Sequence, residues 1–208
     1  MAEEEPRSAR KRRAILEAAT ATFLDHGYLG TSMDEIAAAA GVSKQTVYKH
    51  FADKQSLFTE IVTSTVNAAA EPVHDEVARL AASGDVETDL RDLARRQLAA
   101  VMRPELMRLR RLVIGEVNRF PELGRTFFER GPGRTIETLA GAFGRLAERG
   151  ELELDDAERA ANHFNWLVMS SPINRAMLLG DDGQPTQREL DEHADAGVHA
   201  FLAAYRPR

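Results

Sequence analysis

Apolar residues recur at intervals of three and four along most of the chain, and no segment alternates apolar with polar residues. This period is typical of helices that bury one face. In the first predicted helix, residues 8–26, the apolar stripe runs through Ile15, Ala19 and Phe23. We therefore expect an all-α protein.

Glycines, prolines and capping residues divide this pattern into separate helices. Gly27 and Gly41 are suited to end helices, whereas Ser43 and Asp53 are suited to begin them. We expect the Gly131-Pro132-Gly133 run to separate two helices and Pro172 to kink another. The predicted helices are 8–26, a short one from Thr31 or Ser32 to Gly41, 44–50, one from Lys54 to about Ala69 or beyond Pro72, 86–102, 104–120, 121–131, 134–149, 155–179 and 186–205.

Two short predicted helices, around 31–41 and 44–50, form a helix-turn-helix pattern. Ala37 is small enough for the two helices to approach closely, and Gly41 allows the left-handed backbone of a tight turn. Ile36, Val42 and Val47 are the apolar positions that would fix the crossing angle. The remaining face of the second helix is polar and basic, which suits a DNA duplex.

The side chains of that face have the chemistry of base and phosphate recognition. Gln45 can pair with adenine and Thr46 can contact a thymine methyl group. Tyr48 and Lys49 suit phosphates, which fix the register of the protein on the duplex. The residues that we expect at double-stranded operator DNA are Thr31, Ser32, Ser43, Lys44, Gln45, Thr46, Tyr48, Lys49, His50 and Lys54.

Charge is distributed unevenly along the chain. The net charge is −6, but residues 7–54 hold eight Lys or Arg against five Asp or Glu, so this head is basic and the remainder is acidic. Such polarity would direct the head toward phosphates. The basic run Arg10-Lys11-Arg12-Arg13 either contacts phosphates or the minor groove, or is a solvated arm.

The sequence shows no motif for a metal site, a cofactor, catalysis or a membrane. The chain has no cysteine, and its six histidines lack the spacing of a helical metal site, so we expect no metal, no cofactor and no catalytic group. The first residues lack the apolar run of a secretory signal, and no stretch is long and apolar enough for a membrane span. We expect a cytoplasmic protein with no membrane partner.

Together these motifs resemble a known family. The head, from about Ala14 to Val62, is similar to the DNA-binding domain of the TetR (tetracycline repressor) family, through Ala14-Ile-Leu-Glu-Ala-Ala, Thr31-Ser-Met-Asp-Glu-Ile-Ala, Ala40-Gly-Val-Ser-Lys, Val47-Tyr-Lys-His-Phe and Lys54-Gln-Ser-Leu-Phe. The segment beginning Arg119-Phe-Pro-Glu-Leu-Gly-Arg resembles the C-terminal domain of AefR-like repressors. Gln45 departs from the smaller residue that family members often carry there, which affects the bases read.

The resemblance implies a DNA-binding head, residues 8–53, on a ligand-binding and dimerisation body, residues 54–208. It implies a homodimer joined through helices 134–149 and 155–179, and a small-molecule effector whose binding moves the helix after Lys54 and lowers DNA affinity. The expected interface residues are Ile136, Leu139, Phe143, Leu146, Phe164, Leu167, Val168 and Ser171. The expected pocket residues are Val66, Gln97, Val101, Val113, Val117, Phe128, Asn165, Trp166 and Met169.

The function expected from sequence is therefore a ligand-responsive regulator, with repression as the family's usual outcome. Two alternatives remain open. One is a helical-bundle enzyme that carries a DNA-targeting head, and the other is a DNA-binding protein that needs no ligand and has little sequence preference.

Overall fold

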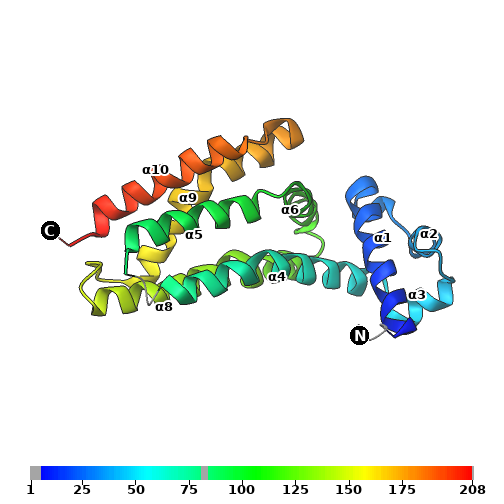
Figure 1. Cartoon of the computed structure of the whole chain (residues 1–208). Coiled ribbons are helices and arrows are strands. Elements are labelled where there is room, and N and C mark those ends of the chain that lie inside the picture. Colours follow the sequence, from blue (N-terminus) through cyan, green and yellow to red (C-terminus); the bar gives the residue numbers. More distant parts are fainter. Residues whose placement is uncertain (1–5, 81–83, 208) are drawn as a thin grey trace, which may run out of the picture. The chain divides into compact units, whose positions relative to one another are not determined.

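All regular structure in the described residues, 6–80 and 84–207 of the computed structural model, is helical, which confirms the all-α expectation (Figure 1). None of these helices is both long enough and apolar enough to cross a bilayer. The helices are α1 (Arg7–Gly30), α2 (Met33–Ala39), α3 (Lys44–His50), α4 (Lys54–Leu80), α5 (Val86–Val101), α6 (Pro104–Glu116), α7 (Pro121–Phe128), the π-helical η1 (Glu129–Gly133), α8 (Arg134–Glu148), α9 (Ala157–Leu179), the 3-10 turn η2 (Gly180–Gly183) and α10 (Gln187–Tyr205).

Side-chain caps explain where several helices begin. Ser32 and Glu35 form a reciprocal capping box at α2, and the Ser43 hydroxyl accepts a hydrogen bond from the backbone N–H of Thr46 at α3. At the start of α4, the Asp53 carboxylate accepts a 2.7 Å bond from the backbone N–H of Ser56. These contacts satisfy N–H groups that have no partner inside the helix, and they confirm Ser43 and Asp53 as starts.

Of two predicted breaks, one is confirmed and one differs from the structure. Gly27 interrupts α1, because its φ of +74° and ψ of 171° are not helical, and a short helical turn then follows to Gly30. The Gly131-Pro132-Gly133 run does not separate helices, because the π-turn η1 joins α7 directly to α8. A π-turn has a wider hydrogen-bond ring than an α-turn and tolerates irregular positions. Gly133 suits this turn, since a Cβ at this position would lie only 3.0 Å from the carbonyl oxygen of Phe128, which is a tight contact.

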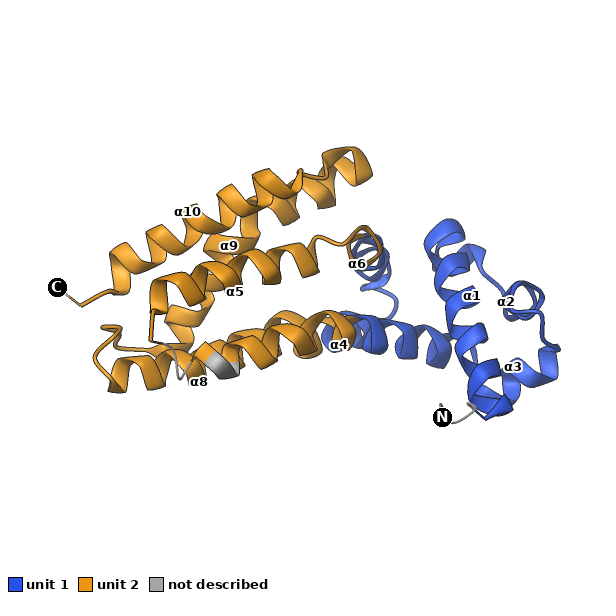
Figure 2. Cartoon of the chain, viewed as in Figure 1, with its two compact units in different colours: residues 1–65, 108–126 blue, residues 66–107, 127–208 orange. Residues whose placement is uncertain are grey.

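The chain divides into two compact units, drawn in different colours in Figure 2. Unit 1 comprises residues 1–65 and 108–126, so it contains α1 to α3, the first part of α4, most of α6 and the first part of α7. Its aromatic core includes Phe23, Tyr28 and Phe58, and the Phe120 ring meets Tyr28 edge-on at 4.8 Å. The expected boundary after residue 53 is therefore too simple, because later segments pack with the head.

Unit 2 comprises residues 66–107 and 127–208. In it α8 packs on α9, while α10 packs on both α5 and α9. Phe143, Phe164 and Phe201 meet at ring-centroid distances of 5.0–5.6 Å, and all three are fully buried. At the edge of this core the Arg95 guanidinium donates two bonds to the Asp195 carboxylate, which lowers the pKa of Asp195.

The predicted dimer-interface stripe is wrong for most of its members. Its buried members belong to the core of a single chain, so their side chains are not available to a second copy: Ile136, Leu139, Phe143, Leu146, Phe164 and Val168. Only Leu167 and Ser171 lie on the exposed face of α9. The reason is physical: the strongest apolar stripe of an amphipathic helix is the one that packs inside its own chain.

Candidate nucleic-acid interface

The helix α3 is held by the residues that the sequence indicated for this purpose. Val47 and Ile36 are fully buried, and Ala37 is 5% exposed. Gly41 has a φ of +63°, and the backbone N–H of Val42 donates a 3.0 Å bond to the Ala37 carbonyl. The turn between α2 and α3 is therefore tight, and one face of α3 is fixed against unit 1.

The opposite face of α3 carries exposed polar side chains. Lys44, Gln45, Tyr48 and Lys49 are all exposed, and Tyr48 has an exposed fraction of 46% although it is aromatic. Among the described residues Gln45 has no hydrogen-bond partner, so both ends of its amide are available. An amide of this kind can bond to adenine with two hydrogen bonds at once.

Other members of the predicted set are engaged within the head. The Lys44 ammonium lies 2.8 Å from the Asp34 carboxylate, and this hydrogen bond raises the pKa of Lys44. The hydroxyl groups of Ser43 and Thr46 are 2.9 Å apart, and the Ser32 hydroxyl caps α2. Their first role is to hold α2 and α3 in place, and DNA would have to compete with these bonds.

Thr31 and Lys54 do not lie on the exposed face, which corrects the expectation that they contact DNA. Thr31 is 3% exposed, and its hydroxyl donates a 2.8 Å bond to the Gly27 carbonyl. The Lys54 ammonium donates 2.8 Å bonds to the carbonyls of both Tyr28 and Thr31 and lies 4.5 Å from the Tyr28 ring centroid.

The Lys54 side chain is directed toward the C-terminal end of α1 because of the free carbonyl groups there. Its last carbonyls lack helical partners, and a cation is a favourable donor at a helix C-terminus. Burial and the nearby Arg119 charge lower the pKa of Lys54. Sequence reasoning missed this role because Lys54 also stands at the start of α4, where a phosphate contact is equally reasonable from spacing alone.

The predicted effector residues fall in different environments. Val66, Met169, Gln97 and Asn165 are buried in unit 2, with exposed fractions of 2–3%, and Val101 is half-buried there. In contrast, Phe128 and Trp166 are 56% and 46% exposed, so in a single chain they lie largely at the surface. Val113, which is buried, and Val117, which is 37% exposed, belong to unit 1.

Gln97 and Asn165 form a buried polar pair between α5 and α9. The Gln97 side-chain N–H₂ donates a 3.1 Å bond to the Asn165 side-chain oxygen. The Gln97 side-chain oxygen is buried and has no hydrogen-bond partner among the described residues. Such an acceptor is costly to leave unpaired, so it can accept a hydrogen bond from a ligand.

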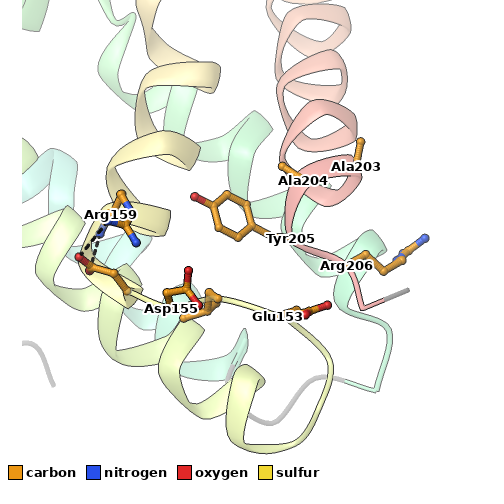
Figure 3. A pocket seen from close by; sticks show the side chains of 9 residues that line it. Glu153, Asp155, Arg159, Ala203, Ala204, Tyr205 and Arg206 are labelled. Carbon is orange, nitrogen blue, oxygen red and sulfur yellow. Dashed lines mark hydrogen bonds and ion pairs between the residues drawn. The ribbon is translucent and has the colours of Figure 1, made fainter.

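Two hollows also mark the surface of unit 2. One, of about 440 Å³, is lined by residues of α7 to α9 that include Phe128, Gly133 and Glu137. The other, of about 450 Å³, lies between the loop before α9 and the end of α10, and Figure 3 shows Asp155, Arg159 and Tyr205 around it. Both are open and carry charged groups of the chain, so neither matches the expected apolar pocket.

The helices α8 and α9 also have an exposed face of small and apolar residues that the sequence analysis did not identify. Gly141 and Gly144 leave the α8 backbone bare: a Cβ at Gly144 would meet nothing within 4 Å, and one at Gly141 would meet only the Arg145 guanidinium. On α9, Trp166, Leu167 and Leu178 are exposed apolar side chains. The available signal was the spacing of these small and apolar residues on the face beside the core stripe.

Two known protein families match separate parts of the chain. Residues 15–61 match the family of bacterial regulatory proteins called tetR, and residues 88–207 match the C-terminal domain of AefR-like transcriptional repressors. The second match alone covers more than half of the chain.

Individual relatives agree with this result. The crystal structure of a TetR-family regulator of Mesorhizobium loti superposes with a TM-score of 0.90, and its sequence is 45% identical to this one. The match covers 98% of this chain and 100% of that chain. The flavonoid-responsive regulator FrrA is 36% identical, with a TM-score of 0.76, over 96% and 99% of the two chains. The HTH-type transcriptional regulator YezE of Bacillus subtilis is 27% identical over 71% of this chain and 75% of its own length.

Proposed function

The chain belongs to the TetR family of bacterial transcriptional regulators, and from that premise we propose that it is a repressor of a palindromic operator. It is a DNA-binding regulator and not an enzyme. The observation that carries the proposal is the exposed face of α3, with Gln45, Tyr48 and Lys49 opposite the buried Val47. Gln45 would read a base edge, while Tyr48 and Lys49 would contact phosphates.

Family members act as dimers, and we propose that this chain pairs through the exposed face of α8 and α9. Bare backbone at Gly141 and Gly144 permits a close approach of helices, and Trp166, Leu167 and Leu178 supply apolar area. A two-fold dimer presents two α3 helices to DNA. Operator half-sites would then lie about 34–36 Å apart, one turn of the duplex.

The proposed effector site lies inside unit 2 at Gln97 and Asn165. Its anchor is the unpaired Gln97 oxygen, which calls for an O–H or N–H donor on the effector. Val101 follows Gln97 by four residues on α5, and Met169 follows Asn165 by four on α9, so each shares a helical face with its polar neighbour. Val66 on α4 is a further position of the predicted pocket that is buried in unit 2. Apolar walls with few polar groups are usual for such sites.

The chemical class that we propose for the effector is a hydroxylated aromatic molecule. The regulator FrrA, which is similar over almost all of both chains, is flavonoid-responsive, and phenolic hydroxyl groups are donors that fit the Gln97 oxygen. Binding would reduce DNA affinity only if the effector prefers the conformation that does not fit the operator.

The operator proposal is tested by selecting bound sequences from a random duplex pool. We expect an inverted repeat with two-fold symmetry and a preference over random DNA of roughly 10³-fold or more. A weak preference without symmetry would contradict the proposal and favour DNA binding that needs no ligand.

The effector proposal is tested by releasing the selected operator with a polyhydroxylated flavone and with its fully O-methylated counterpart. The two share a ring system, but only the first has O–H donors. We expect release by the hydroxylated compound alone, and a Gln97→Leu variant should abolish the difference. Equal release by both compounds would contradict the role of Gln97.

A further inference from the structure

A hollow of about 240 Å³ lies between the start of α1 and the end of α3, and both helices belong to unit 1. Arg7 and Lys11 line it from α1, where a spacing of four places them on one helical face. Lys49 lines it from α3. The complete lining is Arg7, Ser8, Lys11, Thr46, Lys49 and His50.

Among the described residues, the charged side chains that line this hollow are all basic. No carboxylate lines it, and Arg7, Lys11 and Lys49 have no ion-pair partner within residues 6–80 and 84–207. Three like charges around a single concavity repel one another, so the arrangement favours an anion between them.

Arg12 and Arg13 of the basic run form ion pairs within unit 1 instead. The Arg12 guanidinium donates a 2.8 Å bond to the Glu60 carboxylate on α4 and lies 5.2 Å from the Phe51 ring centroid. Arg13 pairs with Glu17 on its own helix at 3.8 Å. Arg12 and Arg13 are thus paired with carboxylates of unit 1, whereas Arg7 and Lys11 line the hollow.

We propose that this hollow holds a phosphate of the DNA backbone, gripped from α1 by Arg7 and Lys11 and from α3 by Lys49. The proposal rests on the proposed function, since α3 must enter the major groove to bring a phosphate here. Lys49 follows the base-reading positions along α3, toward the helix end that lies away from the base edges. A phosphate held from two helices would fix the register in which Gln45 meets its base.

The test is the salt dependence of binding to a short duplex of unselected sequence, which requires neither operator nor effector. Arg7→Gln and Lys11→Gln are compared with Arg13→Gln, which removes one positive charge from the same helix and so serves as a matched control. We expect each of the first two variants to reduce the slope of log K against log salt by about 0.9 for each phosphate that a chain no longer neutralises, and Arg13→Gln to leave the slope unchanged.

Two controls complete the design. Melting temperatures establish that the variants fold, as expected for substitutions of side chains at the surface. Titration with inorganic phosphate at constant ionic strength tests whether the hollow is a point of contact with the duplex: phosphate should weaken duplex binding in the wild type but not in the Arg7→Gln/Lys11→Gln double variant, and equal competition in both proteins would contradict the proposal.

Three results of the salt titrations would overturn the proposed phosphate site. Equal reductions for Lys11→Gln and Arg13→Gln would overturn the proposal in favour of a diffuse effect of charge. Unchanged slopes for Arg7→Gln and Lys11→Gln would overturn it while leaving the proposed function intact. A wild-type protein that binds no duplex at low salt would overturn both.

Discussion

The two units differ in how directly their functional faces follow from their buried faces. In unit 1, Ile36 and Val47 are buried, and the exposed face of α3 is polar. The side chains on that exposed face are of the kinds that bind DNA. In unit 2, burial of Phe143 and Phe164 leaves a remainder on α8 and α9 that is itself small and apolar. Hydrophobic periodicity thus identifies the face of a helix that packs in the core in both units. It identifies the functional face only in unit 1, where that face is polar and therefore differs chemically from the core face.

The largest effect should come from removing a core ring that the apolar stripe alone would place at the dimer interface. Phe143→Ala should destabilise the protein by about 3–5 kcal/mol, because Phe143 is fully buried and the cavity cannot close. Urea unfolding at a fixed protein concentration measures this effect. Leu167→Ala, on the exposed face of α9, is the control and should unfold near the wild type when both are monomeric; a mild Phe143→Ala would show that the core assignment is wrong.

The next effect separates assembly from folding. Gly144→Leu adds a side chain into open space on a single chain, so the monomer should fold normally. At a packed helix interface the same side chain should cost roughly 1–3 kcal/mol for each copy, and symmetry applies it twice. Sedimentation should find a weakened dimer with unchanged helicity. A variant that dimerises as tightly as the wild type would place the interface elsewhere.

A smaller effect distinguishes a structural cation from a phosphate contact. Lys54→Met should destabilise the protein by about 1–2 kcal/mol, because two carbonyls at the end of α1 lose a charged donor that is partly exposed. The salt dependence of DNA binding should not change. A reduced salt slope together with unchanged stability would restore the phosphate role for Lys54.

The smallest effect concerns pH in unit 2. Both ring nitrogens of His74 are buried and have no hydrogen-bond partner in the part of the chain that the structure describes. Burial, aided by the Arg134 charge, lowers the pKa of His74 below its ordinary 6.5, against the opposing effects of Asp75 and Glu71. The folded state therefore disfavours the proton, and stability should fall as the pH drops below about 6.5. His74→Gln should reduce this fall in thermal melts from pH 7.5 to 5. Parallel curves for the two proteins would contradict the assignment.

Local signals in the sequence predicted the head well. Ser43 caps α3, Gly41 has a positive φ and Val47 is buried, because each depends on neighbours within a few residues. Lys54 was harder, since its partners Tyr28 and Thr31 are 26 and 23 residues away. In the body, Trp166 was expected in a pocket but is 46% exposed: the helix was predicted, whereas the orientation of its faces depends on packing between distant segments.

The exposed face of α3 should determine which operator is bound. This expectation is tested most directly by selecting duplexes from one random pool with the wild type, Gln45→Ala and Lys49→Ala in parallel. We predict one inverted repeat for all three, with half-site centres about 10–10.5 base pairs apart. Gln45→Ala should relax one base position in each half-site by roughly 1–3 kcal/mol, while Lys49→Ala should weaken all sequences equally. Identical base preferences for the wild type and Gln45→Ala would show that Gln45 does not read a base, and the absence of a symmetric repeat would show that the protein does not bind a palindromic operator.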